Sequence, residues 1–280
     1  MARGGLSSAP SEQAAGEGAA TVNADADAGE AGLRLITIPI SHYCEKARWA
    51  LDRAGMRYRE ERHIQGIHRI ASKRAGGAGT VPVLVTARGP ISDSADILDW
   101  VDAHVPAERR LFSPEPAARG REEALCVRFD ELLGPAGRRL IYVRMFAHSR
   151  ELLLEFNNVG VPRWEDRFAR VGWSALQHLV ARLLGIRPGI EVEDEATVWH
   201  ELDHVAELLA DGRPYLCGER FGAADLTFAA LCAPVLLPER YGSTLPQPAA
   251  LDDETAALVR RARAHPAGAF AMRLIAEQRP

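Results

Sequence analysis

The sequence predicts an α/β domain followed by an all-α domain, and three observations support this fold class. Residues 33–101 alternate between short β-type runs and two amphipathic helical segments. From Arg121 onward the apolar spacing is helical and contains no convincing strand. The segment from Pro106 to Pro116 between these parts has the composition of a linker. At 280 residues the chain is long enough to form two modest cores.

The α/β part opens with the apolar run Leu33–Ile38, which predicts a strand. An amphipathic helix is expected from Ser41 to about Ala54, ended by Gly55, and Tyr58–Ile64 predicts a second strand. A Gly-rich basic stretch of no defined structure follows. The later expected elements are a strand at Thr80–Val85 interrupted by Pro82, a turn at Gly89–Pro90, a short strand at Ile91–Ser92 and a helix opened by Asp93–Ser94 that runs through Val101.

The domain boundaries follow from composition. The expected division is a disordered Ala/Gly-rich tail at 1–32, an α/β domain at 33–106, a linker at 107–120 and an all-helical domain at 121–280. The tail has almost nothing bulky to bury, so its ordering could not be offset by buried apolar surface.

Bulk composition excludes several classes of protein. A formal net charge of −4 and a pI near 6.2 argue against a nucleic-acid partner. No apolar stretch reaches the roughly 20 residues that cross a bilayer, and the first thirty residues lack a signal peptide, so a cytoplasmic protein with no membrane partner is expected. The four cysteines lack zinc-type spacing, so neither a disulfide nor a metal is expected.

The candidate chemistry lies where the first strand meets the first helix. Ser41 and Cys44 lie near a helix N-terminus, where unpaired N–H groups and the helix dipole stabilise a thiolate. Ser41 could also be only a helix cap. It replaces the first cysteine of a Cys-x-x-Cys pair, which argues against a dithiol oxidoreductase. Cys44 could be a nucleophile, although a buried inert thiol is more common. His42 could be a second polar group at this site, although a solvated residue of the first helical turn is favoured.

Three segments in this order resemble the glutathione S-transferase family. They are Ile38-Pro39-Ile40-Ser41-His42-Tyr43-Cys44-Glu45-Lys46-Ala47-Arg48-Trp49-Ala50-Leu51, Thr80-Val81-Pro82-Val83-Leu84 and Ile91-Ser92-Asp93-Ser94-Ala95-Asp96-Ile97. The resemblance covers Leu33 to Arg279 and implies a thioredoxin-like N-terminal domain followed by a helical C-terminal domain.

The resemblance also implies roles for individual residues. Ser41 stands where serine-type members keep the hydroxyl that donates to the glutathione sulfur. Val81, before a Pro82 expected to be cis, stands where backbone groups pair with the cysteinyl moiety. Asp93 and Ser94 match the pair that receives the γ-glutamyl end, although both could serve only as helix caps.

Two other positions bear on this resemblance. Phe221-Gly222-Ala223-Ala224-Asp225 is similar to the buried capping box of the family's helical domain, but Gly222 replaces the usual Ser or Thr, so only the Asp225 half is expected. Thr37 occupies the place of the catalytic tyrosine of tyrosine-type members. The resemblance therefore favours Ser41 as the residue that activates the sulfur.

The implied activity is a detoxification-type transferase that activates glutathione, its cosubstrate, for attack on a small apolar electrophile. Of the aromatic residues in the helical part, Tyr142 and Phe146 are the candidates for the acceptor pocket wall, although they could belong to the core. A homodimer is expected from the family. Three alternatives stay open: a glutathione-dependent isomerase, dehalogenase or peroxidase; a non-catalytic binding or regulatory protein; and another low-molecular-weight thiol in place of glutathione.

Overall fold

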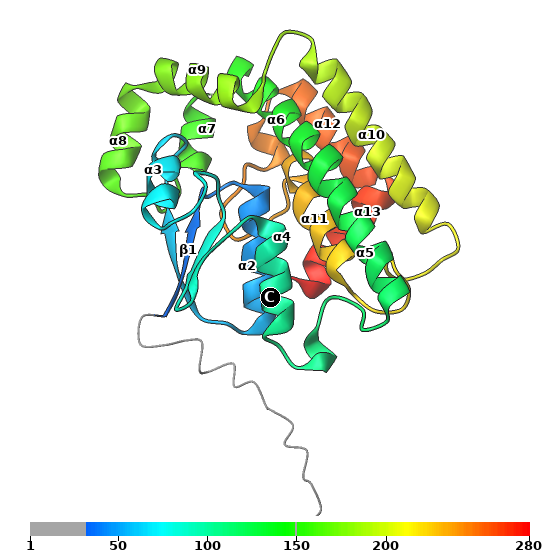
Figure 1. Cartoon of the computed structure of the whole chain (residues 1–280). Coiled ribbons are helices and arrows are strands. Elements are labelled where there is room, and N and C mark those ends of the chain that lie inside the picture. The colour runs from blue at the N-terminus through cyan, green and yellow to red at the C-terminus, as the bar shows by residue number, and fades with distance from the viewer. Residues whose placement is uncertain (1–31, 149) are drawn as a thin grey trace, which may run out of the picture.

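The computed structural model describes residues 32–148 and 150–280, which form a small α/β part and a larger helical part (Figure 1). The order of the elements confirms the fold class expected from the sequence. The tail expected at 1–32 lies outside the described residues except for Gly32.

The α/β part contains one four-stranded sheet with the strand order β2-β1-β3-β4. The strands are β1 (Leu33–Thr37), β2 (Tyr58–Arg62), β3 (Val83–Thr86) and β4 (Gly89–Ser92). Strand β1 pairs in parallel with β2 and antiparallel with β3, which pairs antiparallel with β4. The parallel pair requires a crossover, and helix α2 (His42–Ala54) supplies it.

Capping residues fix the ends of the helices in this part. Ser41 caps α2 through its side chain, and Gly55 ends the helix in the left-handed conformation with φ of 69°. Helix α4 (Ser94–Ala103) begins after Asp93, whose carboxylate accepts the N–H of Ala95. Both helices begin where the sequence places their caps, and α2 also ends as expected, whereas α4 runs to Ala103 and so extends beyond the expected end at Val101.

The helical part begins with α5 (Pro116–Arg128), which continues through a π-helical turn at Phe129–Leu133 into α6 (Gly134–His148). The later helices are α7 (Arg150–Asn157), α8 (Arg163–Val171), α9 (Trp173–Leu184), α10 (Ile190–Leu208), α11 (Ala223–Leu236), α12 (Asp253–Ala264) and α13 (Pro266–Gln278). Short 3-10 turns lie at Ala107–Arg109 and Pro248–Ala250.

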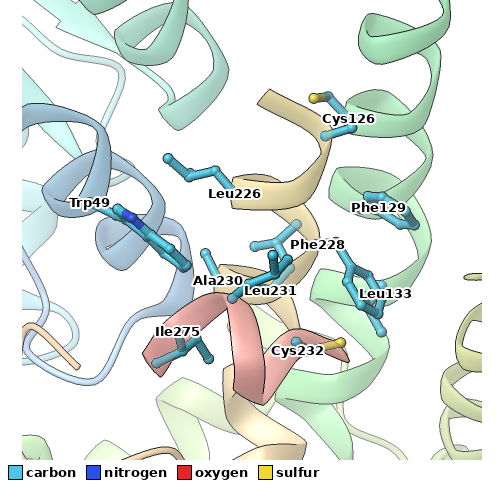
Figure 2. Close-up of a cluster of buried hydrophobic side chains, with 14 of the residues drawn as sticks. Trp49, Cys126, Phe129, Leu133, Leu226, Phe228, Ala230, Leu231, Cys232 and Ile275 are labelled. Atoms are coloured by element: carbon cyan, nitrogen blue, oxygen red, sulfur yellow. The ribbon is translucent and has the colours of Figure 1, made fainter. Parts of the chain in front are cut away.

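Helix α11 is the centre of the core, because nearly every one of its residues is buried. It packs against α2, α5, α6 and α13, and Figure 2 shows Phe228 and Leu231 of α11 among side chains of α2, α5, the π-helical turn and α13. Trp49 of α2 and Phe129 of the π-helical turn are fully buried in the same cluster. The α/β part and the helical part therefore share one hydrophobic core, which holds the site between them in a fixed geometry.

The structure corrects several element assignments. Helix α3 (Ile67–Arg74) lies in the Gly-rich basic stretch, for which the sequence predicts no element. Gly89–Pro90, expected as a turn, belongs to β4, while β3 begins only at Val83. Strand β2 ends at Arg62, and α5 takes in residues 116–120 of the expected linker. The exact domain boundaries stay predictions.

Candidate functional site

Two neighbouring cavities lie where the α/β part meets the helical part. The first, of about 320 Å³, is here called the apolar cavity, because residues such as Ile141, Met145 and Leu153 line it. The second, of about 520 Å³, is called the polar cavity and is lined by Asp93, Ser94, Asp130 and others. Both cavities are lined by Tyr43, Thr80, Val81 and Arg138, so they share a wall.

Ser41 lies at the N-terminus of α2 and lines the apolar cavity. Its Oγ accepts a hydrogen bond from the backbone N–H of Cys44 at 3.3 Å. The cap therefore holds the hydroxyl at the cavity wall, and the helix N-terminus adds a positive partial charge there. Capping and a role toward a ligand are compatible at this position.

Cys44 lies inside α2 and is completely buried. Burial raises the pKa of its thiol, and Arg48 and the hydrogen bond with Ser41 offset this only in part. A thiol of this kind is a poor nucleophile at neutral pH. The geometry therefore favours the inert reading of Cys44 over the nucleophilic one.

His42 is only 2% exposed, so the expectation that it is a solvated first-turn residue is wrong. Burial and the nearby Arg138 hold its pKa well below the usual value, so the imidazole is neutral. Its Nε2 is buried and has no hydrogen-bond partner among the described residues. His42 also lines the apolar cavity, so its neutral ring is part of the cavity wall.

The Val81–Pro82 peptide bond is cis, as expected from the sequence. The register of β3 with β1 and β4 begins at Val83, so the backbone of Val81 lies outside the ladder. Val81 lines both cavities. An extended peptide could therefore pair with the backbone of Val81 as an added strand.

Asp93 and Ser94 lie at the N-terminus of α4 and line the polar cavity. Asp93 has φ of 90°, a conformation that L-residues rarely adopt, and such strain is common at binding sites. Ser94 is buried. The free N–H groups of a helix N-terminus can bind a carboxylate at this end of the cavity.

Two acidic residues of the polar cavity were missed from the sequence: Asp130 and Glu131 of the π-helical turn. Oδ2 of Asp130 accepts a hydrogen bond from Lys46 Nζ at 2.7 Å, whereas its Oδ1 is buried without a partner among the described residues. Tyr43 donates its hydroxyl proton to the backbone oxygen of Asp130 at 2.8 Å. The polar cavity thus combines an anion-binding helix end with a carboxylate that can accept from an ammonium group.

Arg138 of α6 was also missed. It lines both cavities, and its guanidinium lies over the Tyr43 ring, 5.8 Å from the ring centroid. Its spacing of four from Tyr142 is a signal that could have placed it on the same helix face.

Tyr142 lines the apolar cavity as expected, and its hydroxyl oxygen accepts a hydrogen bond from Gln65 Nε2 at 2.8 Å. Phe146 does not line this cavity and packs against Tyr142 and Trp173, with ring centroids 5.4 and 6.1 Å away. The role of Tyr142 and Phe146 in an acceptor pocket stays a prediction.

Two features are absent from the described residues. No group of three or more His, Cys, Asp or Glu side chains among them could hold a metal ion. In the same part of the chain, no helix is both long and apolar enough for a membrane span.

Residues 35–109 match the family described as glutathione S-transferase, N-terminal domain. No curated protein sequence matches the chain. The chain is similar to solved structures of three bacterial proteins. The first is a glutathione S-transferase from Xanthobacter autotrophicus Py2, with 19% identity, coverage of 88% of this chain and 93% of that chain, and a TM-score of 0.58. The second is a glutathione S-transferase from Sinorhizobium meliloti 1021, with 17% identity, coverage of 88% and 99%, and a TM-score of 0.54. The third is a glutathione transferase homologue from Sulfitobacter with bound glutathione, with 15% identity, coverage of 85% and 95%, and a TM-score of 0.50.

At these identities the solved structures show a common fold, and the family match covers the α/β part of the chain. The thioredoxin-like sheet, the cis peptide bond before β3 and the helical part agree with both findings. Residues 35–109 therefore match the N-terminal domain of the glutathione S-transferase family, and the chain as a whole has the glutathione S-transferase fold.

Proposed function

We propose that the protein is a glutathione transferase that holds the glutathione sulfur as a thiolate and directs it at an electrophile in the apolar cavity. The observation that carries this proposal is the shared wall of the two cavities, with Ser41 at the α2 N-terminus beside it. A peptide in the polar cavity can thereby present its sulfur to an apolar acceptor.

The polar cavity matches the γ-glutamyl end of glutathione. Its α-carboxylate is assigned to the N-terminus of α4 at Asp93 and Ser94, and its ammonium group to the carboxylate of Asp130. The cysteinyl backbone is assigned to Val81, and this arrangement directs the sulfur toward Ser41.

The proposed reaction then requires that the glutathione sulfur is ionised and that it is aligned with the electrophilic carbon. The thiol loses its proton to solvent, and the Ser41 hydroxyl donates a hydrogen bond to the sulfur, which favours the ionised form. The thiolate attacks an electrophilic carbon, a carbon–sulfur bond forms, and the leaving group departs with its electron pair. Alignment of the two reactants in adjoining cavities supplies much of the acceleration.

This proposal predicts turnover of glutathione with 1-chloro-2,4-dinitrobenzene. Ser41→Ala should lower kcat/KM by about tenfold or more at pH 6.5 and by less at pH 9, because free glutathione ionises by itself at high pH. Cys44→Ala is the matched control on the same helix and should keep the activity of the parent protein, since Cys44 is buried and inert.

Calorimetric titration with glutathione separates the remaining outcomes. Binding with no turnover on a broad panel of electrophiles would identify a non-catalytic binding protein. No heat from the parent protein would reject glutathione as the ligand. A large loss of activity in Cys44→Ala would transfer the nucleophilic role from the bound thiol to that residue.

A further inference from the structure

The charged side chains that line the apolar cavity are all basic. Its lining includes two arginines, Arg69 and Arg138, and no aspartate or glutamate. The two histidines of the lining are neutral, because burial lowers the pKa of His42 well below its usual value and that of His68 to about 4. A cavity that is otherwise apolar therefore carries net positive charge, which favours an anionic occupant.

Arg138 has no carboxylate partner among the described residues. Its Nε is buried and has no hydrogen-bond acceptor, and burial lowers the pKa of the guanidinium. The next residue, Arg139, shows the contrast, since its Nε donates to Asp194 at 2.9 Å. Asp130 of the polar cavity is bonded to Lys46 instead. Arg138 is half-buried, and a guanidinium partly removed from water without an anion is unfavourable, so a ligand that supplies one is expected to bind there.

The position of Arg138 along α6 orients such a ligand. Arg138, Ile141, Tyr142 and Met145 follow the spacing of a single helix face, and all four line the apolar cavity. The cationic end of this face lies at the wall shared with the polar cavity, beside Tyr43, and apolar side chains follow it. An occupant with a charged end and an apolar body would match this order.

From this geometry we infer that the apolar cavity takes acceptors with an apolar body and one anionic group, a carboxylate or sulfonate, and that Arg138 binds that group. The identity of such molecules as reaction acceptors rests on the proposed function, whereas their binding does not. A carboxylate could also come from the glycine end of glutathione, so the experiments must distinguish the two sources.

The binding test uses two fluorescent probes of similar apolar shape, the anionic 8-anilinonaphthalene-1-sulfonate and the neutral N-phenyl-1-naphthylamine. Arg138→Gln should weaken binding of the anionic probe by at least about tenfold and leave binding of the neutral probe within about twofold. Arg138→Lys, which keeps the charge, should retain part of the preference. Arg182→Gln is the matched control, because it removes one charge from an exposed position of α9, outside the cavity lining.

The turnover test uses 4-chloro-3,5-dinitrobenzoate and its methyl ester, each corrected for its uncatalysed reaction with glutathione. The parent protein should prefer the acid, and Arg138→Gln should lower the acid-to-ester ratio of kcat/KM by about tenfold or more. Repeating the assay with glutathione monoethyl ester, blocked at the glycine carboxylate, should give the same fall in the ratio.

Two results would overturn the inference. Equal weakening of both fluorescent probes would mean that Arg138 only maintains the shape of the cavity. Arg138→Gln could instead raise the KM for glutathione equally with both electrophiles, and this rise could disappear with the monoethyl ester. That result would mean that Arg138 binds the glycine carboxylate of glutathione and not the acceptor. Because probe binding needs no turnover, loss of the probe preference would be seen even if the transferase activity were absent.

Discussion

Asp225 shows how opposing effects act on one buried side chain. Its carboxylate accepts the N–H of Leu216 at 2.8 Å and of Gly222 at 2.9 Å, so the half of the capping box that the sequence predicts is present. These bonds lower the pKa of Asp225, but burial has the larger effect and raises it to about 6. The charged form is therefore less favourable in the folded chain than in the unfolded chain.

This shift gives Asp225 a defined pH dependence. Because its folded pKa lies above the unfolded value, its contribution to stability is complete below about pH 4 and is lost as the pH rises through about 6. The destabilisation caused by Asp225→Asn should therefore be larger at pH 4.5 than at pH 7.5, by up to about 2 kcal/mol. Urea unfolding of both proteins at the two pH values measures the difference. A cost that grows with pH would mean that the two N–H donors outweigh burial.

Residues that repeat a known local pattern were predictable, and residues defined by distant packing were not. Ser41 and Asp93 are helix caps that the sequence places correctly, since a cap depends only on its next few neighbours. The burial of His42 depends on residues near Gly134, almost a hundred positions away, and no local pattern records it.

Helices α12 and α13 approach each other closely at a glycine, and a substitution can test this contact. Gly268 of α13 faces the backbone of Ala262 in α12, and a Cβ at Gly268 would collide with the carbonyl oxygen of Ala262. The absence of a side chain therefore sets the distance between these two helices.

Gly268→Ala should destabilise the protein by about 2 kcal/mol or more, because the backbone of α12 must move to admit the new methyl group. Gly120→Ala is the matched control, since Gly120 lies in α5 with nothing within 4 Å of an added Cβ. It should stabilise the helix by about 0.5–1 kcal/mol. Thermal or urea unfolding compares the two variants, and an equal effect of both would contradict the close approach at Gly268.

Some helices and strands could be predicted from the sequence and others could not, and the difference has a physical reason. Long amphipathic segments such as α2 carry a periodic signal, and β1 is a clear apolar run. Helix α3 is short, has no side-chain cap and follows a glycine, so its sequence gives no start signal. Strand β4 contains Pro90, which reads as a turn residue but is tolerated at the edge of the sheet.

The assembled chain is held together by an ion-pair cluster that reaches from its last residues to α2. Nε of Arg279 donates to Glu45 Oε1 at 2.7 Å, and its Nη1 lies 2.8 Å from Asp52 Oδ2. Glu45 and Arg279 are both buried. The C-terminal segment is therefore part of the contact between the helical part and the α/β part.

Arg279→Met should lower the free energy of unfolding by about 3 kcal/mol, because it leaves Glu45 buried with weaker compensation. The exposed pair of Arg187 and Glu193 provides the control, and Arg187→Met should have little effect because surface pairs contribute little. Denaturant unfolding at neutral pH measures both. If Arg279→Met is as stable as the parent protein, the cluster does not hold the two parts together.

The part of the site that comes from the α/β domain could be predicted from the sequence, whereas the part that comes from the helical domain could not. Ser41, Val81, Pro82, Asp93 and Ser94 lie in sequence segments that carry a family resemblance, and all of them line one of the two cavities. The missed residues, Asp130, Glu131 and Arg138, come from the helical part. Asp130 and Glu131 lie in a π-helical turn that has no sequence signature here. The spacing of Arg138 from Tyr142 indicates a shared helix face, but not the packing of α6 that brings this face to the site.

The most direct test is the pH titration of glutathione bound to the protein, followed by the ultraviolet absorbance of its thiolate. Bound to the parent protein, glutathione should ionise at least one pH unit below the value of about 8.5 typical of a free thiol. In Ser41→Ala the peptide should still bind, but the thiolate should appear about one pH unit higher than in the parent protein. Ionisation at the same pH in both proteins and in free solution would contradict the role of the Ser41 hydroxyl.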